Sequence, residues 1–209
     1  MIQIKEYNIA IDLDGVCCNF QRIFSQVANT LFGDRCPILI GDEATYWDWE
    51  KFYPINKKEI SMCWDYIEKV KNFWLTLEPW DLSGLMYMRD ALSDIEFVNM
   101  YFITARHKTL GYSIAKQSRI WLEEHGIKNA QVLGAFDKTP ILNGLQIRDY
   151  IDDNTDNVSN ALAYSTNGLD VYAYDCKHNR SLDMEFAFHA KYHRVNNLKE
   201  FTEKVMLKL

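Results

Sequence analysis

Residues 7–16, Tyr-Asn-Ile-Ala-Ile-Asp-Leu-Asp-Gly-Val, join an apolar run to two closely spaced aspartates. A short apolar run that ends abruptly in Asp12 is typical of a strand buried on both faces of a parallel sheet. Asp12 then stands at the carboxyl end of that strand, where open α/β sheets build their active sites. Gly15 permits a sharp turn after Asp14, so the two carboxylates can converge. One can act as a nucleophile while the other transfers protons, although a solvated Asp-x-Asp-Gly turn would have the same sequence.

Strands and amphipathic helices alternate from about residue 83 onwards. The pattern predicts strands at 96–103, 130–133, 149–151 and 169–174, and helices at 83–93, 109–125, 156–163 and 197–208. This alternation predicts an α/β fold with a Rossmann-like, doubly wound parallel sheet. Earlier in the chain, helices predicted at 19–32 and 57–72 flank an irregular stretch. We therefore expect a core domain of residues 1–17 and 82–209, with a small helical cap, residues 18–81, inserted after the first strand.

Polar side chains follow three more of the predicted strands. Thr104 ends the second strand, Lys138 comes after the third, and Asp152-Asp153 ends the fourth. A hydroxyl and an ammonium can hold phosphoryl oxygens, and a divalent cation would offset the repulsion between paired acids. Taken singly, these residues also suit a helix cap, a solvated lysine and an exposed acidic turn. Because the carboxyl ends of parallel strands share one edge of the sheet, the predicted fold brings all of them together.

In this order, Asp-x-Asp-Gly-Val, Thr, Lys and Asp-Asp resemble the motifs of the haloacid dehalogenase-like superfamily of phosphatases. The opening motif, residues 12–20, and the segments 72–79, 137–139 and 151–153 are similar to those of the 5'(3')-deoxyribonucleotidases. The superfamily's cap, inserted early in the chain, corresponds to the predicted insertion. The resemblance implies a phosphatase that acts through an aspartyl-phosphate.

The resemblance also implies a role for each motif residue. Asp12 would be the nucleophile, and Asp14 would protonate the leaving oxygen and then activate water. Thr104, Ala105 and Lys138 would bind the phosphate.

A magnesium ion is the cofactor that the resemblance implies. Its ligands would be the Asp12 carboxylate, the main-chain carbonyl of Asp14, and Asp153, with waters filling an octahedral shell. Asp152 is the alternative to Asp153, which we favour because the second acid of such a pair is usually the ligand in these enzymes.

Aromatic residues are concentrated between residues 46 and 80, in the predicted cap. Flat rings can stack on a nucleobase, and the resemblance favours Phe20 and Trp47 as base or sugar contacts, with Phe73 as a further candidate. The plainer alternative is that these rings form the core of the cap. One departure concerns Thr104, which is followed by Ala-Arg where the nucleotidases usually have Ser and then Pro. Arg106 can therefore reach a phosphate or lie outside the site.

The composition limits the choice of substrate and compartment. A formal net charge of -6 argues against a protein that binds nucleic acid stably, because such proteins need a basic surface. Five cysteines without a CxxC pair, together with an N-terminus unlike a signal peptide, predict a cytoplasmic protein without a membrane partner.

We therefore expect a 5'-nucleotidase acting on a small nucleoside monophosphate. Three other readings stay open: a phosphatase of another small phosphomonoester, a polynucleotide 3'-phosphatase, and a binding module without activity. The sequence also leaves a homodimer open.

Overall fold

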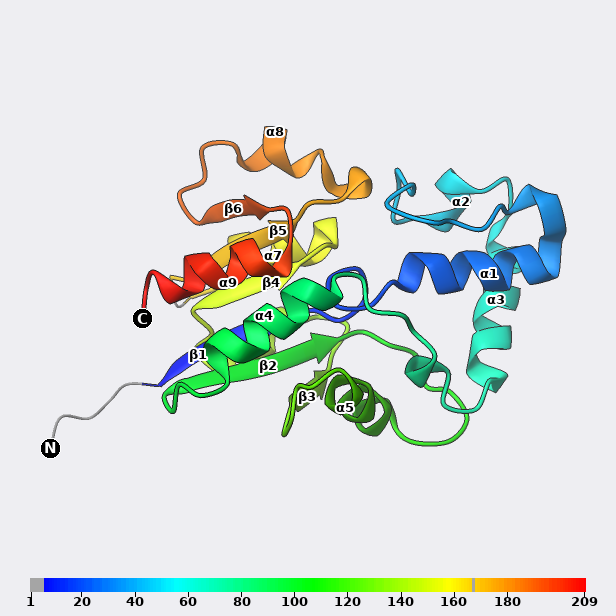
Figure 1. Cartoon of the computed structure of the whole chain (residues 1–209). Coiled ribbons are helices and arrows are strands. Elements are labelled where there is room, and N and C mark those ends of the chain that lie inside the picture. The colour runs from blue at the N-terminus through cyan, green and yellow to red at the C-terminus, as the bar shows by residue number, and fades with distance from the viewer. Residues whose placement is uncertain (1–5, 167) are drawn as a thin grey trace, which may run out of the picture.

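The computed structural model describes residues 6–166 and 168–209, so residues 1–5 and 167 of the predicted core lie outside the described residues. Within these ranges the chain forms a six-stranded sheet in the order β3-β2-β1-β4-β5-β6, with every pair parallel (Figure 1). The strands are β1 Tyr7–Ile11, β2 Val98–Thr104, β3 Gln131–Gly134, β4 Asp149–Asp152, β5 Asp170–Tyr174 and β6 Tyr192–Val195. The order reverses between β1 and β4, which creates the crevice that active sites in this fold occupy.

Helices cover both faces of the sheet, as the apolar strands require. Alternate residues of β1 point to opposite faces: Ile9 and Ile11 join one buried cluster, whereas Ala10 joins the other. The first cluster packs against α4 Leu82–Leu92, α5 Ile114–Glu124 and α9 Leu198–Met206. The second packs against α6 Thr139–Gly144, α7 Thr155–Tyr164 and α8 Leu182–Phe186. The prediction of a doubly wound, Rossmann-like α/β fold is confirmed.

The segment between β1 and α4 is helical and extends away from the sheet (Figure 1). It contains α1 Phe20–Phe32, α2 Trp49–Phe52, α3 Lys57–Lys69 and the 3-10 turns η1 Gly33–Arg35 and η2 Phe73–Leu75. Asn56 and Glu59 form a capping box that fixes the start of α3. The two connections to the core run together, because Asn19 N donates to the Glu78 carbonyl and Trp80 N to that of Cys17 (2.8 and 2.7 Å).

In the core, one strand and two α-helices were missing from the prediction. The sixth strand, β6, contains His193 and Arg194, and its polar side chains reach Asp170, Asp175 and Asp183. An edge strand of this kind has no apolar run, so its sequence gives no strand pattern. Helices α6 and α8 are too short for a recognisable helical period. The helix predicted from residue 109 begins instead at Ile114, because the Ser113 hydroxyl caps it.

None of the helices in the described ranges combines the length and apolar character needed to cross a bilayer.

Candidate active site

Asp12 lies at the end of β1 within a buried group of charges. The Lys138 ammonium donates to the Asp12 carboxylate and to Asp152 Oδ2 (2.7 Å for the second contact). Both side chains of the Lys138–Asp12 pair are nearly inaccessible, with 3% and 7% exposure. The carboxylate of Asp153 lies beside this pair, so that oxygens of Asp12, Asp152 and Asp153 are within 4.8 Å of one another at the carboxyl edge of the sheet. Such a group carries excess negative charge in a buried place.

Asp152 has its hydrogen-bonding capacity filled by protein groups. Its carboxylate accepts from Lys138, from the Tyr150 hydroxyl, from the main-chain N–H of Asn154 and from the amide of Asn157. These bonds tie the end of β4 to the start of α7. Asp152 is thus well placed to hold Lys138 in position.

The carboxylate of Asp153, unlike that of Asp152, has no hydrogen-bond donor among the described residues. Both carboxylate oxygens are buried and accept no hydrogen bond from the described residues. His178 Nε2 lies 3.2 Å from Oδ2, but it bonds to the Asp153 main-chain carbonyl, which Asn179 also contacts (3.0 and 2.8 Å). A β-carbon on Gly15, whose φ is +96°, would fall 2.1 Å from Asp153 Oδ2. Unsatisfied buried carboxylate oxygens beside a glycine suit a hard divalent cation such as Mg²⁺.

Burial changes the titration of this group of charges. It raises the pKa of Asp12, against the effect of Lys138 and with that of Asp152 and Asp153. It also raises the pKa of Asp153, against the opposing charge of the nearby His178. Burial opposes the charge on Lys138, but Asp12 and Asp152 outweigh it and raise the Lys138 pKa. The cluster therefore favours a bound proton or cation, and Lys138 stays charged.

The carboxylate of Asp14 is paired with the guanidinium of Arg106, not with the ammonium of Lys138. Arg106 Nε lies 2.9 Å from Oδ2, and Arg106 Nη2 lies 2.8 Å from Oδ1, which makes a bidentate pair. The Thr104 hydroxyl contacts the same carboxylate at 3.1 Å. The Arg106 side chain is completely buried, whereas that of Asp14 is 15% exposed. The two aspartates of the opening motif therefore have different partners.

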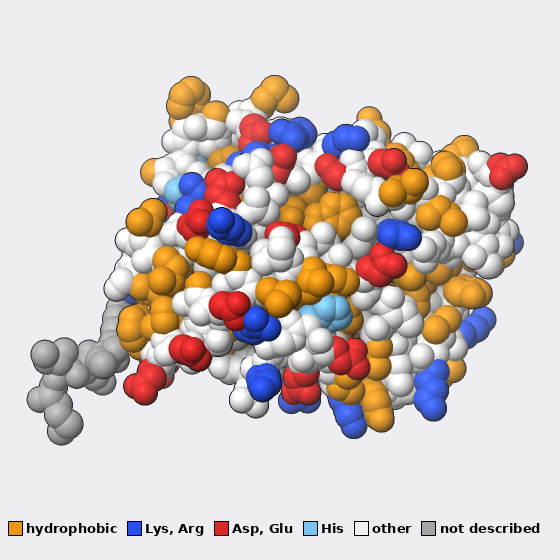
Figure 2. Space-filling model, viewed as in Figure 1, with side chains coloured by type: hydrophobic (Ala, Val, Ile, Leu, Met, Phe, Trp, Pro, Cys, Tyr) orange, Lys and Arg blue, Asp and Glu red, His pale blue; other side chains and the backbone are white. Residues whose placement is uncertain are grey.

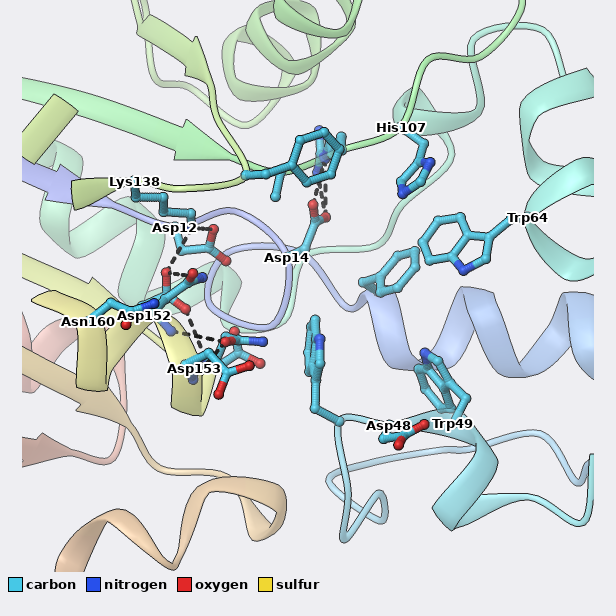
Figure 3. Close-up of a pocket in the computed structure, with 18 of the residues that line it drawn as sticks. Asp12, Asp14, Asp48, Trp49, Trp64, His107, Lys138, Asp152, Asp153 and Asn160 are labelled. Carbon is cyan, nitrogen blue, oxygen red and sulfur yellow. Dashed lines mark hydrogen bonds and ion pairs between the residues drawn. The ribbon is translucent and has the colours of Figure 1, made fainter. Parts of the chain in front are cut away.

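A cavity of about 500 Å³ opens beside these groups. In Figure 3, the carboxylates of Asp12, Asp152 and Asp153 lie on one side of it, and Trp49, Trp64 and His107 lie on the other. This volume is in the range of sites for small organic ligands. The cavity thus combines a charged, buried floor with an aromatic wall supplied largely by the inserted helices.

The aromatic wall is continuous. The Phe20 ring stacks on Trp64 (centroids 5.7 Å apart), and Trp64 stacks on His107 (4.5 Å). His107 in turn meets Phe136 edge to face at 5.7 Å. The wall therefore joins α1 and α3 to two loops at the carboxyl edge of the sheet.

The predicted base contacts are placed unequally. Phe20 and Trp47 line the cavity. Phe73 does not: its ring is 3% exposed and packs against Trp74, and Trp74 lines the cavity instead. The expectation for Phe73 is thus corrected, because the η2 turn directs the neighbouring ring toward the site. Ala105 and Lys138 line the cavity, whereas Thr104 reaches it through Asp14.

Several residues near the site were missed or given no role. Trp64 and His107 line the cavity, and Arg106 binds Asp14. His178 and Asn179, in the 3-10 turn Lys177–Asn179, support Asp153 from the segment after β5. Polar residues gather at the site where parallel strands end, and the segment that contains His178 and Asn179 follows the end of β5. Its position in the chain was therefore the signal that could have identified these two residues.

Comparison with known proteins gives one family match. The family model described as "5' nucleotidase, deoxy (Pyrimidine), cytosolic type C protein" matches residues 6–204. No curated protein matches the sequence.

Solved structures share the fold at low sequence identity. A "predicted phosphatase" from Clostridium acetobutylicum is 16% identical, with 99% of this chain and 100% of that chain covered and a TM-score of 0.60. A haloacid dehalogenase superfamily hydrolase from Geobacter sulfurreducens is 19% identical, with 96% of each chain covered and a TM-score of 0.54. The D,D-heptose 1,7-bisphosphate phosphatase from Burkholderia thailandensis is 8% identical, with 96% of this chain and 99% of that chain covered and a TM-score of 0.55.

Proposed function

Because the chain belongs to the deoxy (pyrimidine) 5'-nucleotidase family, cytosolic type C, and is therefore a phosphatase of the haloacid dehalogenase-like superfamily, we propose that it is a magnesium-dependent nucleotidase acting on (deoxy)ribonucleoside monophosphates. One observation carries this proposal. The cavity that contains Asp12 also contains a wall of aromatic rings, so one ligand can reach both. A phosphate at the charged floor and a nucleobase against the rings would fill it.

In the first step, a carboxylate oxygen of Asp12 attacks phosphorus and the bond from phosphorus to the ester oxygen breaks. Lys138 supports this step in two ways, because its contact with Asp12 orients the nucleophile and its charge attracts phosphoryl oxygens. Ala105, directly after β2, lines the cavity and would contact the same oxygens.

The departing nucleoside oxygen takes its proton from Asp14, which leaves an aspartyl-phosphate on Asp12. In the second step a water molecule attacks that phosphorus and gives its proton to Asp14. Inorganic phosphate leaves, and both aspartates return to their starting states. The separate partners of Asp12 and Asp14 support this division of labour.

Asp153 and the Asp12 carboxylate, with the main-chain carbonyl of Asp14, would hold magnesium, and the filled contacts of Asp152 favour Asp153 as the ligand. When bound, the ion supplies positive charge that offsets the buried carboxylates and the charge developing on the phosphoryl group.

The predicted cap, residues 18–81, is part of the proposal. The paired connections at residues 17–19 and 78–80 support a unit inserted into the core at one point of the chain, and Glu68 and Leu110 add a main-chain contact between the two. This unit supplies Phe20, Trp47 and Trp64 to the cavity. The cap would therefore select the base, while the core, residues 1–17 and 82–209, carries the chemistry.

A small substrate fits the charge distribution better than a long nucleic acid. On the face shown in Figure 2, Lys and Arg side chains are scattered among Asp and Glu. Asp48, Glu50 and Asp156 also line the cavity and would repel additional phosphates. A cytoplasmic location fits the family description and the five reduced cysteines, all of which are buried.

The test is phosphate release from a panel of deoxyribonucleoside and ribonucleoside monophosphates, sugar phosphates and a 3'-phosphorylated oligonucleotide. Each is measured with magnesium, with EDTA, and with an Asp12→Asn variant. Magnesium-dependent release from nucleoside monophosphates that the variant lacks is the expected result. Release only from another class would keep the mechanism and overturn the substrate, and release unaffected by EDTA would overturn the metal.

A further inference from the structure

Arg106 has a completely buried guanidinium next to the proposed acid–base residue. Its contacts account for most of its hydrogen-bonding capacity. Nε and Nη2 form the fork to Asp14, Nη2 also lies 3.1 Å from Cys18 Sγ, and Nη1 lies 2.8 Å from Ser118 Oγ. Of five N–H groups on a guanidinium, these contacts use four. Arg106 is therefore committed to protein partners rather than directed at a ligand.

The plane of the guanidinium is fixed as well. It lies 4.8 Å from the centre of the Trp74 ring, in cation–π contact. Trp74 is itself held, since its indole N–H donates to the His107 carbonyl and its main-chain N–H to Gln117 (2.8 and 3.0 Å). Gln117 and Ser118 are neighbours on α5. Helix α5 thus holds both the guanidinium and the ring beneath it.

The carboxylate of Asp14 has little freedom in this arrangement. A bidentate fork fixes both the position and the plane of a carboxylate, which a single ammonium cannot do. The Thr104 hydroxyl approaches the same group from the end of β2. A proton-transfer residue must hold its oxygen within hydrogen-bonding reach of the reacting atom, and an error of about 1 Å costs roughly 100-fold in rate.

From these contacts we infer that Arg106 is a positioning residue, which holds Asp14 in the orientation needed to protonate the leaving oxygen of the phosphomonoester. Ser118 and Trp74 hold Arg106 in turn. This inference rests on the proposed function, because it gives Asp14 the role of acid.

A comparison of leaving groups tests the inference. A nucleoside oxygen needs a proton to leave, whereas 4-nitrophenolate leaves as a stable anion and needs none. With kcat/KM as the measure, Arg106→Gln is expected to lose about 100-fold on a nucleoside monophosphate, from the usual worth of general acid catalysis, and less than about 10-fold on 4-nitrophenyl phosphate. Asp14→Asn is expected to show the same selectivity.

Arg119→Gln is the matched control. Arg119 is exposed on α5, next to Ser118, and its one side-chain bond is to the Ala115 carbonyl. The Arg119→Gln variant should keep the wild-type kcat/KM on both substrates. Ser118→Ala keeps Arg106 but removes one of the side chains that hold it. We expect this variant to lose about 10-fold in kcat/KM on the nucleoside monophosphate and less on 4-nitrophenyl phosphate.

Equal losses on both substrates would overturn the inference, because a role in folding or phosphate binding makes no distinction between leaving groups. No loss on either would also overturn it. If Arg106→Gln does not fold, the same two outcomes in Ser118→Ala decide the question. A wild-type protein inactive on both substrates would refute the proposed function, and the inference with it.

Discussion

Replacing Gly15 with alanine should disrupt the proposed cation site without replacing a charged residue. The new β-carbon would lie 2.1 Å from Oδ2, 2.4 Å from Cγ and 2.8 Å from Oδ1 of Asp153, where ordinary contacts begin at 3.4 Å. Asp153 must therefore move by more than about 1 Å, a displacement that costs roughly 100-fold in catalysis. Loss of a correctly oriented ligand should also weaken Mg²⁺ binding about 10- to 100-fold. The φ of +96° adds about 1–2 kcal/mol of backbone strain.

Gly33→Ala separates this effect from backbone strain. Gly33 also has a positive φ, +61°, but a β-carbon there would meet nothing within 4 Å. Both variants should lose stability in thermal denaturation because of the positive φ, Gly15→Ala more than Gly33→Ala because of its contact with Asp153. Only Gly15→Ala should lose kcat and Mg²⁺ affinity, the second measured by calorimetry. Equal kcat and equal affinity in the two variants would refute the assignment of Asp153 to the cation.

Three other variants test the aromatic wall and the opposite edge of the sheet. Trp64→Ala should raise the KM for nucleoside monophosphates about 10-fold, by loss of base stacking, and leave inhibition by inorganic phosphate unchanged; an equal change in both would contradict a base-binding role. Lys208→Met should destabilise the protein by about 1–3 kcal/mol in chemical denaturation, with kcat/KM unaffected, because Lys208 donates to the buried Asp149, to Asp170 and to Tyr172 far from the cavity. Burial opposes ionisation of Asp170, but hydrogen bonds from Lys208 and His193 outweigh it and hold the Asp170 pKa below its usual value. The stability that Asp170 provides is then complete above about pH 4 and is lost as the pH falls through its lower folded pKa. Asp170→Asn should therefore flatten the loss of stability in that acid range, and a curve parallel to the wild type would count against the ion pair.

The sequence predicted the central strands because a strand buried on both faces of a sheet appears as a continuous run of apolar residues. The stretches that lead into Asp12 and Thr104, residues 9–11 and 100–103, are apolar. Parallel pairing then aligns these ends, which made a shared site predictable before any contact was known. Strand β6 escaped prediction because its His193 and Arg194 bind acidic side chains at the edge of the sheet.

Side-chain direction within the inserted segment could not be predicted in the same way. Phe73 and Trp74 are adjacent and both aromatic, and only the 3-10 turn determines which ring faces the cavity. Trp64 faces the cavity because α3 packs across α1, a contact between helices far apart in the chain. Sequence periodicity locates the buried face of a helix but not the neighbour that covers it.

The two aspartates of the opening motif show how tertiary contacts give similar residues different partners. They are two residues apart, yet Asp12 meets the Lys138 ammonium and Asp14 meets the Arg106 guanidinium. Lys138 is a compact charge that can also attract phosphoryl oxygens, which suits a nucleophile. Arg106 is a rigid fork whose donors are used within the protein, which suits a carboxylate that must stay in one orientation. In the proposed mechanism, the division of roles between the aspartates thus depends on residues 92 and 126 positions away in the chain, brought together by the parallel sheet.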